Sequence, residues 1–85
     1  MMQKLDGNVL AGPLASVFDG DATSATGRCT SCGDTAAVAQ AVVYAATGRY
    51  VARCRRCDQV LLTIAEDGDS VLLAITGITG FAMVP

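Results

Sequence analysis

The residues of this sequence that could do chemistry are its four cysteines, which form two C-x-x-C pairs, CTSC and CRRC. The gap between the pairs, residues 33–53, is 21 residues long and is close to the spacing of tetrahedral zinc sites with four cysteine ligands. Two residues between paired cysteines allow a tight turn that directs both thiolates toward one ion. We therefore predict that one structural Zn²⁺ ion is bound by Cys29, Cys32, Cys54 and Cys57.

The residue that follows each pair supports the same prediction. Such a turn often needs a positive φ directly after its second cysteine, and glycine adopts that conformation without steric cost. Gly33 occupies this position after the first pair, and Asp58 occupies it after the second. Aspartate tolerates the left-handed region better than most residues do, so both turns are compatible with a shared metal ion.

An iron site of the rubredoxin type uses the same two turns and remains an alternative, with one-electron transfer as its function. Rubredoxin-like proteins usually carry glycine after both pairs and several aromatic residues that shelter the iron. In this chain Asp58 replaces one glycine, and there are only two Phe, two Tyr and no Trp. A thioredoxin-type dithiol needs a single pair in a βαβ context, which the sequence after Cys32 does not offer.

Most of the positive charge lies in or near the two cysteine pairs. Five of the six cationic residues are there: Arg28, Arg49, Arg53, Arg55 and Arg56. One interpretation is structural, because four thiolates around Zn²⁺ carry a net charge of about −2 that arginines neutralise. The other is a contact surface formed by Arg53, Arg55 and Arg56 for an acidic protein, a phosphate or a cofactor. A nucleic-acid-binding zinc ribbon is a further alternative. The net charge of −2, the pI near 4.6 and the lack of clustered stacking aromatics disfavour it.

Catalysis by this chain is not predicted. The sequence contains no histidine, which excludes Ser-His-Asp and Cys-His units and the usual catalytic zinc sites. Its glycines follow neither the dinucleotide-binding nor the P-loop spacing. The acidic residues Glu66, Asp67 and Asp69 crowd an expected turn and are most simply a solvated loop.

The elements that must position the cysteines begin with a helix at about residues 8–18. Its apolar residues recur at helical spacing, and Asp6 or Asn8 can cap its start. Pro13 removes one helical hydrogen bond, so the helix is either kinked or begins at Pro13. Strands are predicted at residues 36–44, 49–54, 59–66, 70–76 and 81–84. Helix competes with strand over residues 36–44 because alanine favours helices, and Asp67-Gly68 is a typical hairpin turn.

These elements predict a small α+β fold, in which a zinc-ribbon-like antiparallel β-sheet packs against an N-terminal helix. We expect one domain over residues 1–85, with the ribbon and sheet at about residues 26–85. The apolar helix face is Leu10, Leu14, Val17 and Phe18. It is expected to pack on Val60, Leu62, Ile64, Leu73 and Ile75.

The C-terminal stretch VLLAITGITGFAMVP is apolar on both faces of its expected strand. Either the tail folds back and completes the core, or it forms a docking surface that includes Phe81 and Met83 for a second copy or a larger enzyme. No secretory signal and no apolar run of membrane-spanning length is present, so a cytoplasmic protein without membrane contact is expected.

The segments LDGNVLAGPLASVF, ATGRCTSCG and RCRRCDQVLL together resemble a group of short actinobacterial zinc-ribbon-like proteins of unknown function. The likeness covers about residues 5–77, and LDGN-x-LAGPL is its most specific element. The resemblance implies a metal-binding domain with Cys29, Cys32, Cys54 and Cys57 as ligands, and it supplies no activity. It further implies a small accessory subunit of a redox enzyme, of the sulfite-oxidase-like molybdenum type or a flavin-dependent reductase.

Overall fold

The computed structural model of the protein describes residues 3–15, 17–18 and 22–82. Short helical segments alternate with strands near the N-terminus, and strands dominate after residue 41. The helical segments are η1 (Gly7–Leu10), α1 (Ala11–Ala15), η2 (Ala22–Ser24) and η3 (Val38–Gln40), of which only α1 is an α-helix and the others are 3₁₀ turns. The strands are β1 (Gln3–Asp6), β2 (Thr26–Cys29), β3 (Thr35–Ala37), β4 (Val42–Ala46), β5 (Arg49–Arg53), β6 (Val60–Asp67), β7 (Ser70–Ile75) and β8 (Ile78–Ala82).

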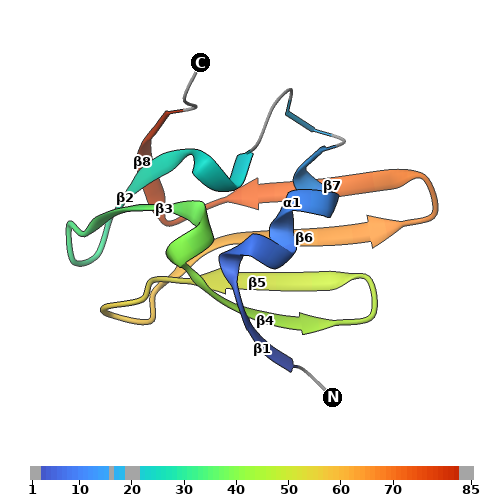
Figure 1. Ribbon diagram of the computed structural model, residues 1–85, viewed down its shortest axis with the longest axis horizontal. Coiled ribbons are helices and arrows are strands. Elements are labelled where there is room, and N and C mark those ends of the chain that lie inside the picture. The colour runs from blue at the N-terminus through green and yellow to red at the C-terminus, as the bar shows by residue number, and fades with distance from the viewer. Residues whose placement is uncertain (1–2, 16, 19–21, 83–85) are drawn as a thin grey trace.

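The described strands form two antiparallel sheets (Figure 1). A five-stranded sheet has the order β1-β4-β5-β6-β7, and a three-stranded sheet has the order β3-β2-β8. Every pair of neighbouring strands is antiparallel. Together with the short N-terminal helix and the clustered cysteines, this confirms the predicted small α+β, zinc-ribbon-like fold class.

The N-terminal segment differs from the single helix predicted at residues 8–18. Strand β1 comes first and pairs with β4, and the helical part is the turn η1 followed by the five-residue α1. Asp6 caps η1, because its Oδ1 accepts a hydrogen bond of 2.9 Å from the N–H of Asn8. The helix is short since Ala11–Ala15 contains both a glycine and a proline, which are poor helix formers.

Gly7 explains how η1 reaches its position in the core. A Cβ atom at this residue would lie 1.8 Å from the carbonyl oxygen of Val38, so only glycine lets the two backbones meet. Turn η1 therefore packs directly on turn η3. This close approach places the neighbouring Leu10 and Leu14 in the interior, where both are almost fully buried.

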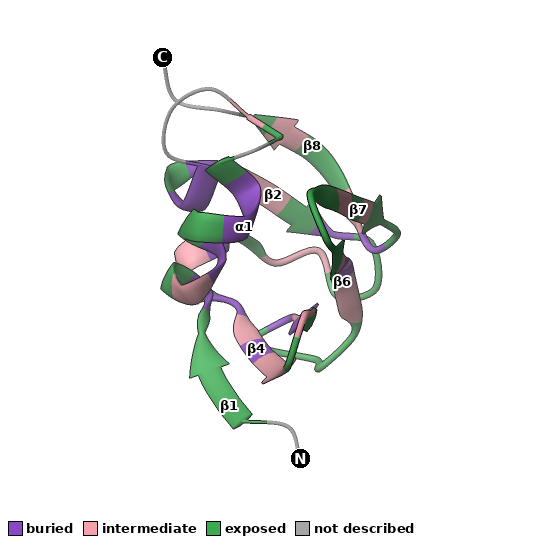
Figure 2. Ribbon diagram, turned by 90° about the vertical axis from the view of Figure 1, so that its right-hand side faces the viewer, coloured by how far each residue is buried: buried purple, intermediate pink, exposed green. Residues whose placement is uncertain are grey.

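The core lies between this helical segment and one face of the five-stranded sheet (Figure 2). The predicted packing of Leu10 and Leu14 against Leu62 and Ile64 is confirmed, since all four are buried in one cluster. Three further predicted members are only half-buried, namely Phe18, Val60 and Leu73.

Two predicted core residues were assigned wrongly. Val17 is 44% exposed because the helix ends at Ala15, so the helical spacing no longer directs Val17 toward the sheet. Ile75 is 39% exposed because β7 is the last strand of its sheet, so no further strand covers it.

The strand predicted at residues 36–44 is in fact two strands in different sheets. Turn η3 separates β3, in the three-stranded sheet, from β4, in the five-stranded sheet. The side-chain Oε1 of Gln40 accepts a hydrogen bond of 3.1 Å from the N–H of Ala37 and stabilises this turn. The run of alanines and valines carried no signal for the break, whereas the following β4–β5 hairpin was predicted correctly.

The C-terminal part forms the predicted β6–β7 hairpin and then β8, an edge strand that pairs with β2. Phe81 of β8 is half-buried and packs against Phe18, with the ring centroids 5.6 Å apart. The tail therefore contributes to the core at this point, while Met83 lies outside the described residues. No helix among the described residues is long and apolar enough to cross a membrane.

Candidate metal centre

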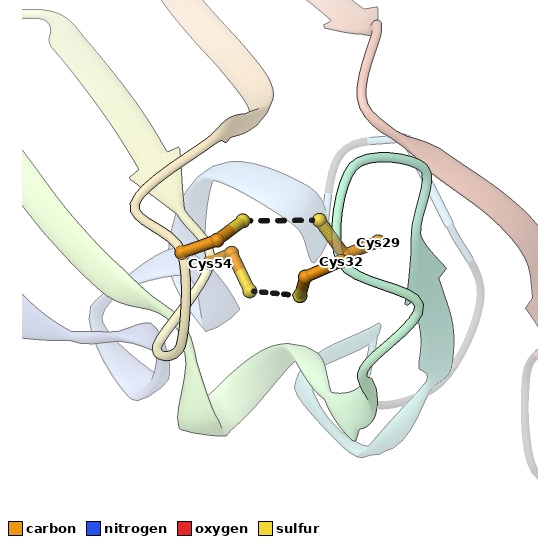
Figure 3. A group of neighbouring side chains, drawn as sticks. Cys29, Cys32 and Cys54 are labelled. Carbon is orange, nitrogen blue, oxygen red and sulfur yellow. Dashed lines mark hydrogen bonds between the residues drawn. The ribbon is translucent and has the colours of Figure 1, made fainter.

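The two cysteine pairs lie at the turns of two hairpins that belong to different sheets. The first turn, residues 29–34, connects β2 with β3, and the second, residues 54–59, connects β5 with β6. We call them the first and second knuckle. They face each other and bring the four sulfur atoms together (Figure 3). The β4–β5 hairpin returns the chain to this place, as its predicted position required.

The first knuckle is closed by two backbone hydrogen bonds around Cys29. Its carbonyl oxygen accepts a bond of 2.9 Å from the N–H of Gly33, and its N–H donates a bond of 2.8 Å to the carbonyl oxygen of Asp34. Gly33 has a φ of 79°. The predicted positive φ after the second cysteine is thus confirmed, and it allows the chain to reverse directly behind Cys32.

The second knuckle repeats this pattern around Cys54. Its carbonyl oxygen accepts a bond of 3.0 Å from the N–H of Asp58, and its N–H donates a bond of 2.8 Å to the carbonyl oxygen of Gln59. Asp58 has a φ of 64° and is the only non-glycine residue with positive φ in the part of the chain that is described. Two turns of unrelated sequence therefore have the same hydrogen-bonding scheme, as expected if both present thiolates to one ion.

The sulfur atoms are spaced as four ligands of one metal ion would be. The Sγ atoms of Cys29 and Cys57 are 3.6 Å apart, as are those of Cys32 and Cys54, and all four lie within 4.8 Å of one another. A regular tetrahedron with metal–sulfur bonds of about 2.3 Å has edges of about 3.8 Å. The four thiols are free rather than joined in disulfides. This arrangement can hold a metal ion, and an all-thiolate ligand set suits zinc or iron rather than magnesium or calcium.

Each knuckle contributes one buried and one exposed thiol. Cys29 and Cys54 are buried, whereas Cys32 and Cys57 are exposed. Backbone N–H groups point at the buried sulfurs, and the N–H of Arg56 donates to Sγ of Cys54 over 3.4 Å. A hydrogen bond from the N–H of Cys32 is the main cause that lowers the pKa of Cys29 to about 7. Such bonds favour the thiolate, which is the form that binds a metal.

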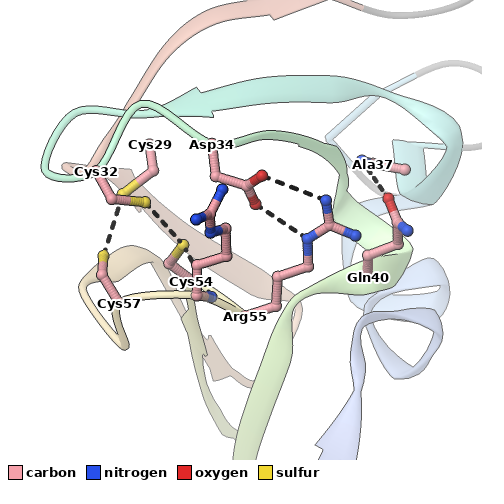
Figure 4. A network of polar contacts seen from close by, with 9 residues as sticks. Cys29, Cys32, Asp34, Ala37, Gln40, Cys54, Arg55 and Cys57 are labelled. Carbon is pink, nitrogen blue, oxygen red and sulfur yellow. Dashed lines mark hydrogen bonds and ion pairs between the residues drawn. The ribbon is translucent and has the colours of Figure 1, made fainter.

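An ion pair joins the two knuckles beside the sulfur atoms. The Nε and Nη2 atoms of Arg55, in the second knuckle, donate hydrogen bonds of 3.0 and 3.3 Å to the two carboxylate oxygens of Asp34, the last residue of the first knuckle (Figure 4). The side chain of Asp34 is only 11% exposed. The hydrogen bonds from Arg55 hold the pKa of Asp34 below its ordinary value, and they raise the pKa of Arg55. This two-pronged contact fixes the orientation of one knuckle relative to the other.

Arg53 also contacts its own chain. Its Nη1 donates a hydrogen bond of 3.0 Å to the backbone carbonyl of Asp58 and lies 3.8 Å from the carboxylate of that residue. Its guanidinium carbon lies 5.8 Å from the ring centroid of Tyr44. The side chain of Arg56 is exposed. Arg53 and Arg55 thus have structural partners within the chain, at Asp58 and Asp34. Neutralisation of the thiolate charge and the contact surface of Arg53, Arg55 and Arg56 remain predictions.

The role of Asp34 was not predicted. The sequence showed it only as an acid near the first cysteine pair, and its partner lies 21 positions away. The available signal is a charged residue two positions after one C-x-x-C pair and an opposite charge inside the other pair. That signal becomes specific only when the two knuckles are known to face each other.

Comparison with models of known protein families gives a match that spans the whole chain. The sequence model of the family described as "Family of unknown function (DUF6510)" matches residues 1–85. The chain belongs to this family. The match of the DUF6510 model includes both knuckles and the N-terminal segment with Gly7. No curated protein and no solved structure matches the chain.

Proposed function

We propose that this protein is a non-enzymatic zinc-binding protein in which one Zn²⁺ ion, held by all four cysteines, has a structural role. The observation that carries the proposal is the cluster of four free thiols within 4.8 Å at two matching knuckles. Four thiolates complete a tetrahedral coordination shell. Structural zinc sites are closed in this way, whereas catalytic sites keep a position for water or substrate.

The placement of the knuckles supports the structural role. One belongs to the three-stranded sheet and the other to the five-stranded sheet, so a shared ion would fasten the two sheets to each other. Among the described residues, the large side chains that are fully buried are few: Leu10, Leu14, Leu62 and Val43. Zinc binding supplies on the order of 10 kcal/mol to the folding of small zinc domains, which is large beside so small a core.

For the biological role, we propose an interaction module or accessory subunit of a larger cytoplasmic enzyme. Three features support this role. The protein is small, its proposed metal site is closed, and its edge strand β7 exposes apolar residues such as Leu72. The resemblance to short actinobacterial zinc-ribbon-like proteins favours an oxidoreductase as the larger partner. Nucleic-acid binding is less well supported, because Arg53 and Arg55 already have partners within the chain.

The structural role of the metal is tested by unfolding the protein, removing metal with a chelator and refolding it with or without Zn²⁺. The proposal predicts dispersed amide signals in NMR spectra only with Zn²⁺, together with a large rise in melting temperature. Cys57→Ser should lose the effect, and Ser31→Ala, in the first knuckle, should keep it. A fully folded, equally stable protein without metal would contradict the structural role. A red protein that binds iron and cycles between two oxidation states would favour electron transfer.

The accessory role is tested by purifying a tagged copy from its native host and measuring flavin and molybdenum in what copurifies. The proposal predicts a stoichiometric partner that carries one of these cofactors. Recovery of the protein alone would contradict an accessory role. A salt-sensitive shift with DNA or RNA that Arg56→Glu abolishes would favour the nucleic-acid alternative. Arg56 is the suitable residue for this test, because changing Arg55 would also break its pair with Asp34.

A further inference from the structure

Three of the four sheet edges formed by described residues are protected against pairing with another chain. Strand β1 is four residues long and carries two charged residues, Lys4 and Asp6. Strand β3 has only three residues. Strand β8 shifts its register against β2 and contains Gly80 at a φ of 63°, so it is not a regular edge. Charges, short length and irregularity are the devices by which natural sheets avoid edge-to-edge association.

The fourth edge, β7, has none of these devices. Its sequence SVLLAI contains no charge, no proline and no glycine, and its pairing with β6 is continuous over all six residues. Two of its apolar side chains are conspicuously exposed, Leu72 at 68% and Ile75 at 39%. A long, regular and apolar edge of this kind is suited to accept another strand.

The register of the β6–β7 hairpin determines which backbone groups of β7 are free. Asp67 and Ser70 are partners across a two-residue turn, and such a turn closes on a hydrogen-bonded pair. Hydrogen-bonded and non-bonded pairs alternate in an antiparallel ladder. The N–H and C=O groups of Val71, Leu73 and Ile75 therefore point away from β6, toward the open edge.

We propose that two copies of this chain pair through β7 about a two-fold axis, with Leu73 opposite Leu73 of the partner subunit. An antiparallel arrangement is the one that a two-fold axis perpendicular to the sheet produces. With this register the free groups of Val71 meet those of Ile75 of the partner subunit, and the reverse. Each copy thus satisfies the open edge of the other, and the two sheets become one of ten strands.

The side chains are self-complementary in this register. On the outer face, Leu72 comes to lie opposite Ala74 of the partner subunit, so a large side chain meets a small one. On the core face, Val71 lies opposite Ile75 of the partner subunit. The two large exposed side chains of β7, Leu72 and Ile75, each gain an apolar neighbour, and no charges on the paired strands oppose each other.

The charges at the two ends of the hairpin favour the same orientation. The exposed tip carries Glu66, Asp67 and Asp69. The opposite end of β7 leads to Gly77, whose carbonyl oxygen accepts a hydrogen bond from the N–H of Thr30 in the first knuckle, so the arginine-rich knuckles lie at that end. Antiparallel pairing brings the acidic tip of each copy toward the basic end of the other, and parallel pairing would bring like charges together.

This inference goes beyond the proposed function, because it adds a second copy of the chain as a partner. Its test does not depend on the metal. Sedimentation should show a weight-average mass that rises from 8.7 kDa toward twice that value with concentration. The interface is a single strand pair, so a dissociation constant in roughly the micromolar range is expected.

Leu72→Lys should weaken association at least about tenfold, because it places a charge on the exposed face of the edge strand without touching the core. Gln3→Lys, on β1 at the other edge of the sheet, is the matched control and should leave the mass curve unchanged. Val51→Lys, on the outer face of the interior strand β5, should also leave it unchanged and distinguishes edge pairing from stacking of sheet faces. A monomer at all concentrations, or a Leu72→Lys protein that associates normally, would overturn the proposal.

Hydrogen exchange tests the register itself. The amides of Val71, Leu73 and Ile75 should become protected as the concentration rises through the dissociation constant. The amides of Leu72 and Ala74, which already face β6, should not change. Equal behaviour of both sets would overturn the proposed pairing. Zinc measured in the same samples separates the proposed zinc site from the proposed dimer. A protein with full zinc content that does not associate would contradict the dimer and leave the zinc site intact.

Discussion

At the scale of single residues, the two knuckles depend on a backbone conformation as much as on their thiols. Gly33 and Asp58 both have positive φ, and each donates the hydrogen bond that closes its turn. The clustering of the four cysteines and the need for positive φ could be predicted from the sequence, because paired C-x-x-C spacing and its turn geometry are typical of metal sites. The ion pair of Asp34 with Arg55 could not, since it depends on how the knuckles face each other.

Asp58 offers a direct test of the backbone argument. Asp58→Val should lower the free energy of unfolding by about 1–2 kcal/mol, because a β-branched residue is strained in the left-handed region. Asp58→Asn is the control, since asparagine tolerates the same φ without the charge, and it should change stability by less than about 0.5 kcal/mol. Denaturant unfolding of the metal-loaded proteins measures both. Equal losses for the two variants would assign the effect to the carboxylate near Arg53.

The ion pair between the knuckles should matter more than the exposed charge beside it. Arg55→Ala should lower the melting temperature of the metal-loaded protein by roughly 2–6 °C, because it removes two hydrogen bonds to a shielded carboxylate. Arg56→Ala, one residue further on, is the matched control and should have little effect. The double variant of Asp34→Ala with Arg55→Ala should be less unstable than the sum of the single changes. Strict additivity in that thermodynamic cycle would contradict a direct interaction.

At the scale of elements, the pattern of apolar residues determined which strands could be predicted from the sequence. Strands β5, β6 and β7 were predicted, since apolar runs flanked the cysteine turn and the Asp67-Gly68 turn. Strand β1 was missed because all of its residues are exposed and its conformation comes from pairing with β4. The break at η3 was missed because it lies inside a run of small apolar residues.

Two glycines of the N-terminal segment test its packing. Gly7→Ala should destabilise the protein by about 2–4 kcal/mol, because the new methyl group would overlap the carbonyl oxygen of Val38. Gly12→Ala, within α1, is the matched control. A Cβ there meets nothing within 4 Å, so the higher helix propensity of alanine should stabilise the protein by about 0.5–1 kcal/mol. Thermal unfolding of both variants measures the difference, and a well-tolerated Gly7→Ala would refute the close contact of η1 with η3.

At the scale of the whole molecule, two sheets meet at the four thiols, and each sheet supplies one knuckle. The three-stranded sheet is the smaller, and Cys29 is the only buried residue in its three described strands. A shared metal ion would therefore stabilise this sheet most. The overall fold class could be predicted from the cysteine turns and the hairpins. The division into two sheets could not be predicted, because it depends on the break at η3, which the sequence did not reveal.

Removal of the metal should loosen the molecule unevenly. With a chelator present, amide hydrogen exchange in β2, β3 and β8 should accelerate by at least about tenfold relative to β4, β5 and β6, because the smaller sheet loses its fastening. Exchange measured before and after chelation, with Zn²⁺ added back as the control, tests this. Uniform acceleration in both sheets would show that the metal supports the fold as a whole rather than the joint between sheets.

The central claim is that one zinc ion is bound by four cysteines, and metal analysis of the purified protein tests it most directly. The protein should be produced without added metal and measured together with its four single Cys→Ser variants. We predict about one zinc per chain in the parent protein and a marked loss of bound zinc with Cys29→Ser, Cys32→Ser, Cys54→Ser and Cys57→Ser alike. Iron in place of zinc, or a folded protein with no metal and two disulfides, would contradict the claim.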